Sequence, residues 1–452
     1  MNPSRSSDDT IIALASGAGR AGVAVVRVSG PGAVGVLAHL SGSPVPEPRK
    51  AVIRALREGG AYLDEAIILY MPGPHSFTGQ DIVEFQIHGG SAVIEAVINA
   101  ALRSRLCRLA DPGEFTRRAF ESGRLDLTQA EAVADLVDAE TEGQRRQAAR
   151  IYQGEAAEAF EGWRGQLISA MAALEASIDF PDESDIPRDI NLGALAPIET
   201  LAAQLESALG EAGRLRSVRE GYRVAILGPT NAGKSSLMNR LARQEAAIVS
   251  AIPGTTRDVV EVRLVIAGFP VWLADTAGLR ETSDVIEAEG VRRALERAEH
   301  ADLRIWVVDG AGGEPSTNVS RETLWRPGDL TACNKSDLAR PGLAGGEDGD
   351  TFRISALTGA GFNALERRLA EIVRERLATE EAPLITRVRH RELVEEALAH
   401  VERALEAARI GVGAELVSED LRLAARALGR ITGTVDAEDL LDLIFSAFCV
   451  GK

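Results

Sequence analysis

Short runs in which apolar and polar residues alternate dominate the first 120 residues, as expected for half-buried β-strands. The predicted strands cover residues 11–15, 22–28, 63–70 and 81–87. Residues 91–106 carry apolar positions at helical spacing and predict an α-helix. A segment rich in Pro, Gly and Ser, residues 71–79, predicts a long loop between the last two strands. The pattern indicates an α+β domain.

The pattern then changes to long amphipathic stretches, which predict helices from about residue 124 to 216, with breaks near Pro181 and Pro187. Helical composition returns after Pro383. Because the two flanks are alike, we expect one helical domain interrupted by an α/β module, with its halves packed together. The predicted domains are residues 1–120 (α+β), 121–217 (helical, first part), 218–379 (α/β module, with a Gly/Pro-rich insertion at 339–350) and 380–452 (helical, second part).

A phosphate-binding loop is predicted at residues 228–235, which read Gly-Pro-Thr-Asn-Ala-Gly-Lys-Ser. The motif follows an apolar run at 222–227, a predicted strand, and precedes a predicted helix at 236–241. In this context the glycines free backbone N–H groups to hold phosphate oxygens at a helix N-terminus. We expect Lys234 to reach the β- and γ-phosphates and Ser235 to ligate Mg²⁺.

Four further motifs follow in the order and spacing of a regulatory GTPase: Gly-Thr-Thr-Arg-Asp at 254–258, Asp-Thr-Ala-Gly at 275–278, Asn-Lys-Ser-Asp at 334–337 and Ser-Ala-Leu at 355–357. Thr256 can complete the Mg²⁺ shell. The Asp337 carboxylate can accept hydrogen bonds from guanine N1 and N2 but none from adenine, so the sequence predicts GTP. The predicted nucleotide-binding residues are Asn231, Ala232, Gly233, Lys234, Ser235, Ser236, Thr255, Thr256, Asp275, Thr276, Ala277, Gly278, Asn334, Lys335, Asp337, Ser355, Ala356 and Leu357.

Composition narrows the setting of this chemistry. Apolar content of 45% and charged content of 26% are typical of a soluble globular protein, and no apolar run approaches the ~20 residues of a membrane span. Three widely spaced cysteines and the absence of a secretory signal pattern predict a cytoplasmic protein with reduced thiols. The net charge of −17 argues against nucleic-acid binding by a global basic field. Arginine-rich stretches at 145–146, 387–391 and 422–430 are candidate local patches, although solvated helix faces paired with glutamates are the favoured interpretation.

Lysine usage points to individual positions. Only four of the 50 basic residues are lysines, at positions 50, 234, 335 and 452. Lys234 and Lys335 fall in the nucleotide motifs, where a compact ammonium is not interchangeable with a guanidinium. The terminal Lys452 therefore suggests a specific role, the alternative being a solvated tail residue.

Motifs outside the nucleotide module carry a family resemblance. They are Glu-Phe-Gln-Ile-His-Gly-Gly at 84–90, Pro-Gly-Glu-Phe-Thr-Arg-Arg-Ala-Phe at 112–120, Leu-Asp-Leu-Thr-Gln-Ala-Glu-Ala at 125–132 and Phe-Cys-Val-Gly-Lys at 448–452. With the GTPase motifs, they resemble the MnmE (TrmE) family of tRNA-modification GTPases along essentially the whole chain. The resemblance implies an α/β plus α fold: a Ras-like P-loop GTPase domain inserted in a helical domain, preceded by an α+β folate-binding domain similar to one-carbon enzymes.

The same resemblance implies the activity and the partners. A homodimer would work with the FAD-dependent protein MnmG, in a heterotetramer, to add a carboxymethylaminomethyl or aminomethyl group to C5 of the wobble uridine of certain tRNAs. A tetrahydrofolate derivative of the 5,10-methylene or 5-formyl type would be held by Arg27, Glu84, Arg124 and Lys452. Position 124 is arginine where better-known members carry lysine. Cations suit the glutamate tail of folate and a carboxylate suits the pterin edge, whereas a structural ion pair is the alternative for Arg27 and Glu84.

Hydrolysis requires a water-positioning group, and Leu279 stands where Ras-type enzymes carry glutamine. The resemblance nominates Glu287 instead, so the predicted catalytic residues are Lys234, Thr256 and Glu287. It also implies a K⁺ site formed when two GTPase domains meet, which would neutralise charge near the β–γ bridging oxygen. The predicted K⁺ ligands are Asn231, Ser250, Ile252 and Thr255, and Ser250 also joins the nucleotide-binding set. Ser250 and Pro253 replace the threonine and alanine expected there. Arg257 as an arginine finger is the alternative.

A competing function is a GTP-driven switch or ribosome-assembly factor without direct chemistry. The nucleotide motifs alone fit both functions. The N-terminal domain and the Cys-Val-Gly-Lys tail discriminate, because neither belongs to a simple switch.

Overall fold

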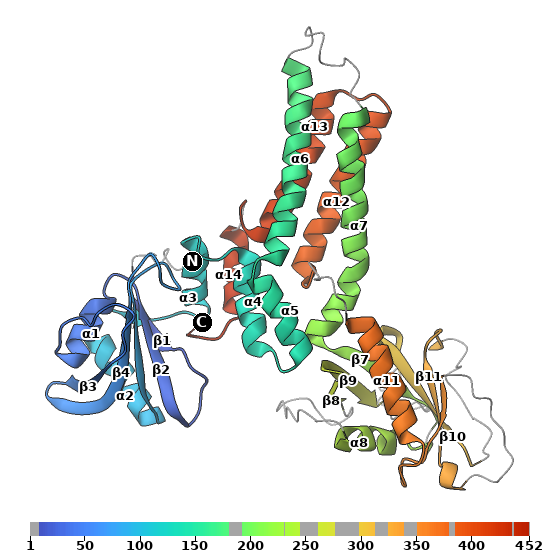
Figure 1. Cartoon of the computed structure of the whole chain (residues 1–452), viewed down its shortest axis with the longest axis horizontal. Coiled ribbons are helices and arrows are strands. Elements are labelled where there is room, and N and C mark those ends of the chain that lie inside the picture. Colours follow the sequence, from blue (N-terminus) through green and yellow to red (C-terminus); the bar gives the residue numbers. More distant parts are fainter. Residues whose placement is uncertain are drawn as a thin grey trace, which may run out of the picture. The chain divides into compact units, whose positions relative to one another are not determined.

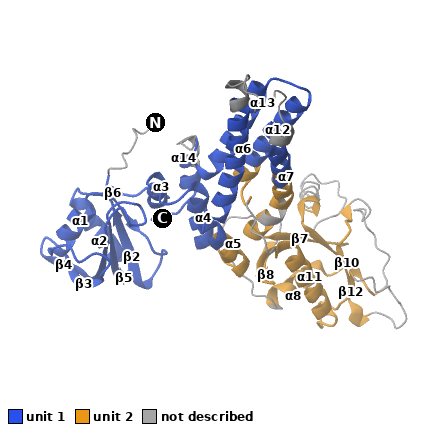
Figure 2. Ribbon diagram, turned by 45° about the horizontal axis from the view of Figure 1, so that its top comes forward, with its two compact units in different colours: residues 1–137, 149–204, 392–452 blue, residues 138–148, 205–391 orange. Residues whose placement is uncertain are grey.

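The structure is a computed structural model that divides into two compact units, shown in Figure 2. Unit 1 comprises residues 1–137, 149–204 and 392–452, and unit 2 comprises residues 138–148 and 205–391. The described residues are 9–179, 192–229, 231–244, 261–275, 298–311, 324–338, 350–378, 385–435 and 438–451. The expected helix breaks near Pro181 and Pro187 and the insertion at 339–350, apart from Asp350, lie outside this described part.

A six-stranded sheet with the strand order β3-β4-β5-β2-β1-β6 forms the first part of unit 1. Its strands are β1 (Ile11–Leu14), β2 (Ala21–Ser29), β3 (Val52–Glu58), β4 (Ala61–Met71), β5 (Ile82–Gly89) and β6 (Arg108–Leu109). Neighbouring strands are antiparallel except β1 and β6, which are parallel. Helices α1 (Ala33–Ser41) and α2 (Ser91–Arg103) pack against one face of the sheet through a buried apolar core.

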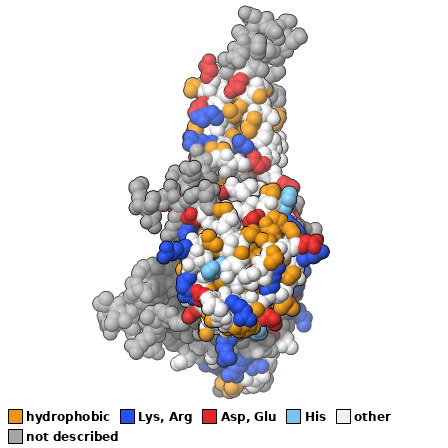
Figure 3. All heavy atoms as spheres, turned by 90° about the vertical axis from the view of Figure 1, so that its left-hand side faces the viewer, with side chains coloured by type: hydrophobic (Ala, Val, Ile, Leu, Met, Phe, Trp, Pro, Cys, Tyr) orange, Lys and Arg blue, Asp and Glu red, His pale blue; other side chains and the backbone are white. Residues whose placement is uncertain are grey.

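The four strands and the helix predicted for this region are confirmed, whereas α1 and β3 were not anticipated. Helix α1 is apolar nearly all round and contains Gly35, so its sequence lacks the amphipathic period that marks a surface helix. Strand β3 carries two arginines and forms an edge of the sheet. The alternation of apolar and polar residues in such a strand is only weak evidence for a β-strand. On the uncovered side of the sheet, Ile53 and Ile67 lie directly opposite each other and are 68% and 40% exposed. Figure 3 shows hydrophobic side chains gathered on one face of the molecule.

The helical part of unit 1 combines chain segments from both sides of the nucleotide module (Figure 1). Its helices are α3 (Glu114–Glu121), α4 (Leu127–Asp138), α5 (Glu142–Tyr152), α6 (Glu155–Asp179), α7 (Leu192–Glu220), α12 (Val388–Arg409), α13 (Ala414–Thr432) and α14 (Glu438–Ser446). The boundary between the units falls at the last residue of α4 and within α5, α7 and α12. Helix α6 packs along α13, and the Thr432 hydroxyl donates a 2.7 Å hydrogen bond to Glu161. Segments more than 250 residues apart therefore share one core, as the similar flanks predicted.

Unit 2 is built around a second six-stranded sheet, with the order β12-β11-β10-β7-β9-β8. Its strands are β7 (Tyr222–Leu227), β8 (Glu261–Ile266), β9 (Phe269–Asp275), β10 (Leu303–Asp309), β11 (Leu330–Asn334) and β12 (Thr351–Arg353). All neighbours are parallel except β8 and β9. Helices α8 (Lys234–Gln244) and α11 (Phe362–Leu377) share one apolar core with this sheet. Because ligands of such sheets bind at the carboxyl ends of the strands, the loops after β7, β10 and β11 define the place to examine.

Two other predictions can be compared with the described residues. None of the described helices is both long and apolar enough to span a membrane. In the arginine-rich stretches, Arg145 and Arg146 both pair with Glu142, and Arg422 pairs with Glu419. These pairs within single helices support the interpretation of those stretches as solvated helix faces.

Candidate functional site

The predicted phosphate-binding loop joins the end of β7 to the start of α8. The ammonium of Lys234, the first residue of α8, donates 2.9 Å hydrogen bonds to the carbonyls of Gly228 and Pro229. Ser235 and Ser236 are exposed on the first turn of the helix. Asn231 holds a left-handed backbone with φ of 64°, which asparagine tolerates better than most residues. The loop therefore presents a cation, two hydroxyls and a helix N-terminus on one side, the combination that binds phosphate.

Two glycines of this loop are required by close approach. Gly228 has φ of 143°, and a Cβ there would overlap the carbonyl of Val307 in β10. Gly233 has φ of 94°, and a Cβ there would overlap the amide nitrogen of Asn334. Any other residue at either position would push the loop away from the neighbouring strand ends.

Asn334 connects the phosphate loop to the last of the sequence motifs. It is 3% exposed and ends strand β11. Its amide donates to the Ala232 carbonyl at 2.8 Å, and its carbonyl oxygen accepts from the Ala356 N–H at 2.9 Å. Three motifs, the first 102 residues before Asn334 and the last 22 residues after it, thus converge on one buried side chain.

Lys335 and Asp337 follow on the surface of the same cavity. The Lys335 ammonium contacts the Asp309 carboxylate at 2.6 Å, and this hydrogen bond lowers the pKa of Asp309. Asp309 ends β10, the strand beside β11, and is directly paired in register with Asn334. Asp337 is exposed in a short 3₁₀ helix (Ser336–Leu338), so its carboxylate is available to a ligand. An exposed acceptor beside an anchored lysine is the arrangement that the base-recognition motif requires.

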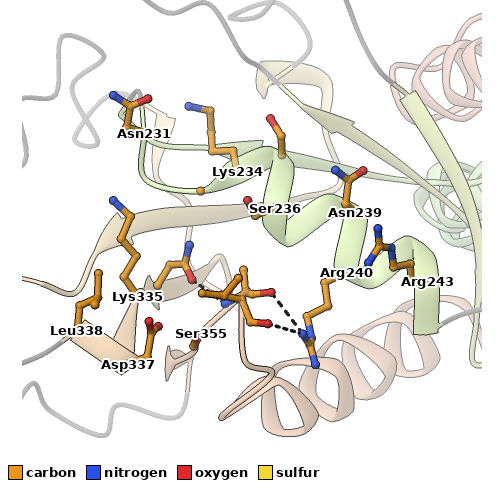
Figure 4. A pocket seen from close by; sticks show the side chains of 15 residues that line it. Asn231, Lys234, Ser236, Asn239, Arg240, Arg243, Lys335, Asp337, Leu338 and Ser355 are labelled. Atoms are coloured by element: carbon orange, nitrogen blue, oxygen red, sulfur yellow. Dashed lines mark hydrogen bonds between the residues drawn. The ribbon is translucent and has the colours of Figure 1, made fainter.

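These elements enclose a cavity of about 1000 Å³ (Figure 4). It is lined by Asn231, Gly233, Lys234, Ser235, Ser236, Asn239, Arg240, Arg243, Asn334, Lys335, Asp337, Leu338, Ser355, Ala356 and Leu357. Every predicted nucleotide-binding residue of the first, fourth and fifth motifs except Ala232 lies in this lining, and Ala232 is buried directly behind it. Asn239, Arg240, Arg243 and Leu338 were not anticipated. Asn239, Arg240 and Arg243 lie on α8 and follow the phosphate loop at helical spacing. Their position on one side of the predicted helix could have been inferred from the sequence.

Part of the predicted site lies outside the described residues. This holds for the predicted ligands and catalytic groups Ser250, Ile252, Thr255, Thr256, Thr276, Ala277, Gly278, Glu287 and Lys452, and also for Pro253, Arg257 and Leu279. Asp275 is the last residue of β9, and the described part does not include its side chain.

A second group of predicted residues lies on the N-terminal sheet. Arg27 of β2 and Glu84 of β5 are directly opposite in register, and the guanidinium contacts the carboxylate at 2.8 Å. Their side chains are 24% and 14% exposed. The Arg27 guanidinium also lies 5.7 Å from the ring centres of Phe77 and Phe115. The pair is consequently ordered but still open to a ligand, so its geometry fits both the folate contact and the structural ion pair.

The C-terminal tail reaches this same domain within one chain. Val450 forms a β-bridge with Pro112, and the Gly113 N–H donates to the Cys449 carbonyl at 3.3 Å. Gly451 lies so close to β1 that a Cβ there would overlap the Leu14 carbonyl. Leu14 belongs to the strand that pairs with β2 one position from Arg27. The tail thus reaches β1, the neighbour of strand β2, which carries Arg27.

Arg124 follows α3 and is exposed. Its side chain lies near Gly79 in the long loop before β5, since a Cβ at Gly79 would be 3.8 Å from the Arg124 Cγ. Arg124 therefore lies next to the loop that precedes β5. No contact between Arg124 and the Arg27–Glu84 pair is seen among the described side chains.

Comparisons with known proteins give the chain its relatives. The model of the MnmE helical domain matches residues 127–449, and that of the GTP-binding protein TrmE N-terminus matches residues 10–124. The tRNA modification GTPase MnmE of Maricaulis maris is 52% identical, with 98% of this chain and 99% of the relative covered. The protein of the same name from Parvibaculum lavamentivorans is 53% identical, with 98% and 100% covered. Among solved structures, the G domain of the T. maritima FeoB iron transporter is 26% identical, with 33% of this chain and 97% of that chain covered and a TM-score of 0.27.

Proposed function

Because this chain belongs to the MnmE family, we propose that it is a GTP-hydrolysing enzyme of tRNA modification. One observation supports the GTPase part above all. A single cavity is lined by the phosphate loop and by both base-recognition motifs, residues 334–337 and 355–357. A purine nucleotide can occupy both parts of this cavity, with its phosphates at the helix N-terminus and its base at the ends of the neighbouring strands.

The described residues supply distinct parts of nucleotide binding. Lys234, now bonded to two loop carbonyls, would exchange those acceptors for β- and γ-phosphate oxygens, which bind a cation more strongly. Asp337 would accept from the guanine N1 and N2 groups. Leu357, whose side chain is 83% exposed, would cover apolar surface of the base. GTP recognition on this proposal rests on residues of this chain alone.

Metal ions would complete the phosphate end. The exposed Ser235 hydroxyl at the start of α8 fits a Mg²⁺ ligand, with Thr256 as the second protein ligand. The left-handed Asn231 fits a K⁺ ligand, together with Ser250, Ile252 and Thr255. When bound, these cations supply positive charge to the phosphates, and Glu287 would position the attacking water.

The N-terminal domain would carry the one-carbon chemistry. Arg27, Glu84 and Arg124 would hold a tetrahydrofolate derivative, with Lys452 brought in by the tail. The ordered but accessible Arg27–Glu84 pair, flanked by two phenylalanine rings, suits a charged and aromatic ligand. Such a ligand would supply the methylene carbon for a group at C5 of the wobble uridine.

The assembly is part of the same proposal. We assign residues 1–120 to a folate-binding and dimerisation domain, residues 218–379 to the GTPase domain, and residues 121–217 and 380–452 to the helical domain. The apolar Ile53–Ile67 pair on the uncovered sheet supports a homodimer contact. An FAD-dependent MnmG partner, in a heterotetramer that acts on tRNA in the cytoplasm, completes the proposal.

Nucleoside analysis of tRNA tests the function. A strain that lacks this gene should lose the modified wobble uridine, and the wild-type gene should restore it. A gene with Lys234→Ala should fail to restore it, whereas Lys50→Ala, at an exposed lysine of the N-terminal domain, should succeed. Unchanged nucleosides in the deleted strain would instead favour a GTP-driven switch.

A further inference from the structure

Arg240 lies at a position of the cavity to which no motif assigns a role. It is on α8, six residues after Lys234, on the side of the helix that faces the loop 355–359. Its Nη1 donates hydrogen bonds of 3.3 Å to the carbonyls of both Ala356 and Leu357, drawn as dashed lines in Figure 4. One guanidinium therefore holds two consecutive carbonyls of the fifth motif.

Neighbouring residues hold the Arg240 guanidinium in its orientation toward the loop. Its Cζ lies 5.4 Å from the ring centre of Phe362, a fully buried residue that begins α11. Its Nε is buried and has no hydrogen-bond partner among the described residues. Gly359, with φ of 88°, leaves the space that the guanidinium fills, because a Cβ there would overlap Nη2. The loop and the arginine are thus shaped to each other.

Two further backbone hydrogen bonds of this loop, between described residues, are local. The Ser355 N–H donates to the Ala360 carbonyl, and the Gly359 N–H donates to the Ser355 carbonyl. These bonds close the loop on itself but do not tie it to the phosphate loop. On the nucleotide side, Asn334 holds the Ala356 N–H. Arg240 holds the carbonyls of Ala356 and Leu357, in the next two peptide units, from α8, the helix that begins at the phosphate loop.

We propose that Arg240 is a positioning residue that sets the distance between the phosphate end and the base end of the nucleotide site. The inference rests on the proposed GTP binding at this cavity. Helix α8 begins at the phosphates and, through Arg240 Nη1, bonds two carbonyls of the base-recognition loop, which keeps guanine in register with Asp337. Loss of these two bonds lets the loop and the base shift together, so the nucleotide leaves faster and the base edge is read less well.

Release of a fluorescent GDP analogue from the full-length protein tests this. Arg240→Ala removes both hydrogen bonds to the loop carbonyls and should speed release at least about tenfold, the factor expected for one charge-assisted hydrogen bond. Arg240→Lys keeps the charge but lacks the planar guanidinium that lies over the Phe362 ring, so its release rate should fall between those of the wild type and Arg240→Ala. Arg367→Ala is the matched control, since this exposed arginine lies on α11 and is not part of the cavity lining. It should release at the wild-type rate.

Base discrimination separates positioning from a general loss of structure. Inosine diphosphate lacks the 2-amino group that Asp337 would read, so the ratio of GDP affinity to IDP affinity reports the register of the base. This ratio should fall in Arg240→Ala and stay unchanged in Arg367→Ala. Gly359→Ala should speed release as well, and its effect should shrink in the Arg240→Ala background because the overlap is gone.

The remaining outcomes separate failure of the proposed GTP binding from failure of the positioning role of Arg240. If the wild-type protein binds no GDP analogue, the proposed function fails. If it binds, and Arg240→Ala keeps the wild-type release rate or the wild-type GDP-to-IDP ratio, only the positioning role is overturned.

Discussion

The amide of Asn334 donates a 2.8 Å hydrogen bond to the carbonyl of Ala232, which ties the base-recognition motif to the phosphate loop across 102 residues of chain. Asn334 is almost completely buried, and the backbone of Gly233 approaches its amide nitrogen too closely for any side chain at that position. The two ends of a nucleotide site are therefore joined before any ligand arrives. Pre-organisation of this kind lowers the cost of binding.

Asn334→Ala should weaken GDP binding by about ten- to a hundredfold. The substitution leaves the buried Ala232 carbonyl and the partly buried Ala356 N–H without their partner, and one unsatisfied buried group costs about 1–3 kcal/mol, which corresponds to that range. Fluorescence titration with a GDP analogue measures the change. Asn363→Ala, at an exposed asparagine of α11 outside the cavity lining, serves as the control. Equal affinities of the two variants would refute the bridging role.

Asp337→Asn should weaken GTP binding and improve xanthosine triphosphate binding. The amide replaces a double acceptor with one donor and one acceptor, which suits xanthine better than guanine. Competition between the two nucleotides on the full-length protein gives the ratio directly. Asp350→Asn, which removes a carboxylate paired with Arg368, should leave the ratio unchanged. The assigned base-recognition motif is wrong if Asp337→Asn binds both nucleotides as the wild type does.

GTP hydrolysis should be faster in KCl than in NaCl at equal concentration. Leu279 offers no hydrogen bond to water, and Asn231 holds the left-handed loop position proposed for K⁺ coordination. Asn231→Ala should flatten the difference between the salts, while the exposed Asn239→Ala should preserve it. Steady-state phosphate release is the measurement. Equal rates in both salts for the intact protein would favour Arg257 as an arginine finger.

Deletion of residues 449–452 should abolish tRNA modification and weaken folate binding but leave GTP binding nearly unchanged. The tail pairs with Pro112 and lies against Leu14, both in unit 1, whereas the nucleotide cavity belongs to unit 2. Lys452→Ala in the full-length chain should reproduce the loss, with the tail pairing kept. Tritiated folate binding and nucleoside analysis are the two readouts. Normal modification by both variants would return Lys452 to a solvated tail residue.

Cys107 should react with iodoacetamide about a hundredfold more slowly at pH 8 than an ordinary exposed thiol. Burial raises its pKa to about 11, so the reactive thiolate is scarce at that pH. Labelling should therefore accelerate as the pH rises toward 10. Cys449 is exposed and provides the internal comparison by peptide mapping. Slow labelling of Cys107 that persists at pH 10 would show that access, rather than ionisation, limits the reaction.

Local sequence was sufficient for the elements that carry the phosphate chemistry. The apolar run at 222–227, the glycines of the loop and the polar–apolar period after Lys234 predict a strand, a turn and a helix, and the structure has β7, the loop and α8 there. The same holds for β1, β2, β4 and β5, whose alternation has the period of the pleat. In each case, the information lies within about ten residues of chain.

Tertiary structure alone decided which distant residues meet. Asp309 pairs with Lys335 because β10 and β11 are parallel neighbours, and Arg240 reaches the loop 355–359 because α8 and α11 share one core. The tail reaches Leu14 because the two helical flanks pack together, and α1 forms where packing rather than period favours a helix. Such contacts depend on the burial of apolar faces by segments far apart in the chain. A periodic pattern determines that each face must be buried, but the packing of the whole chain determines what covers it.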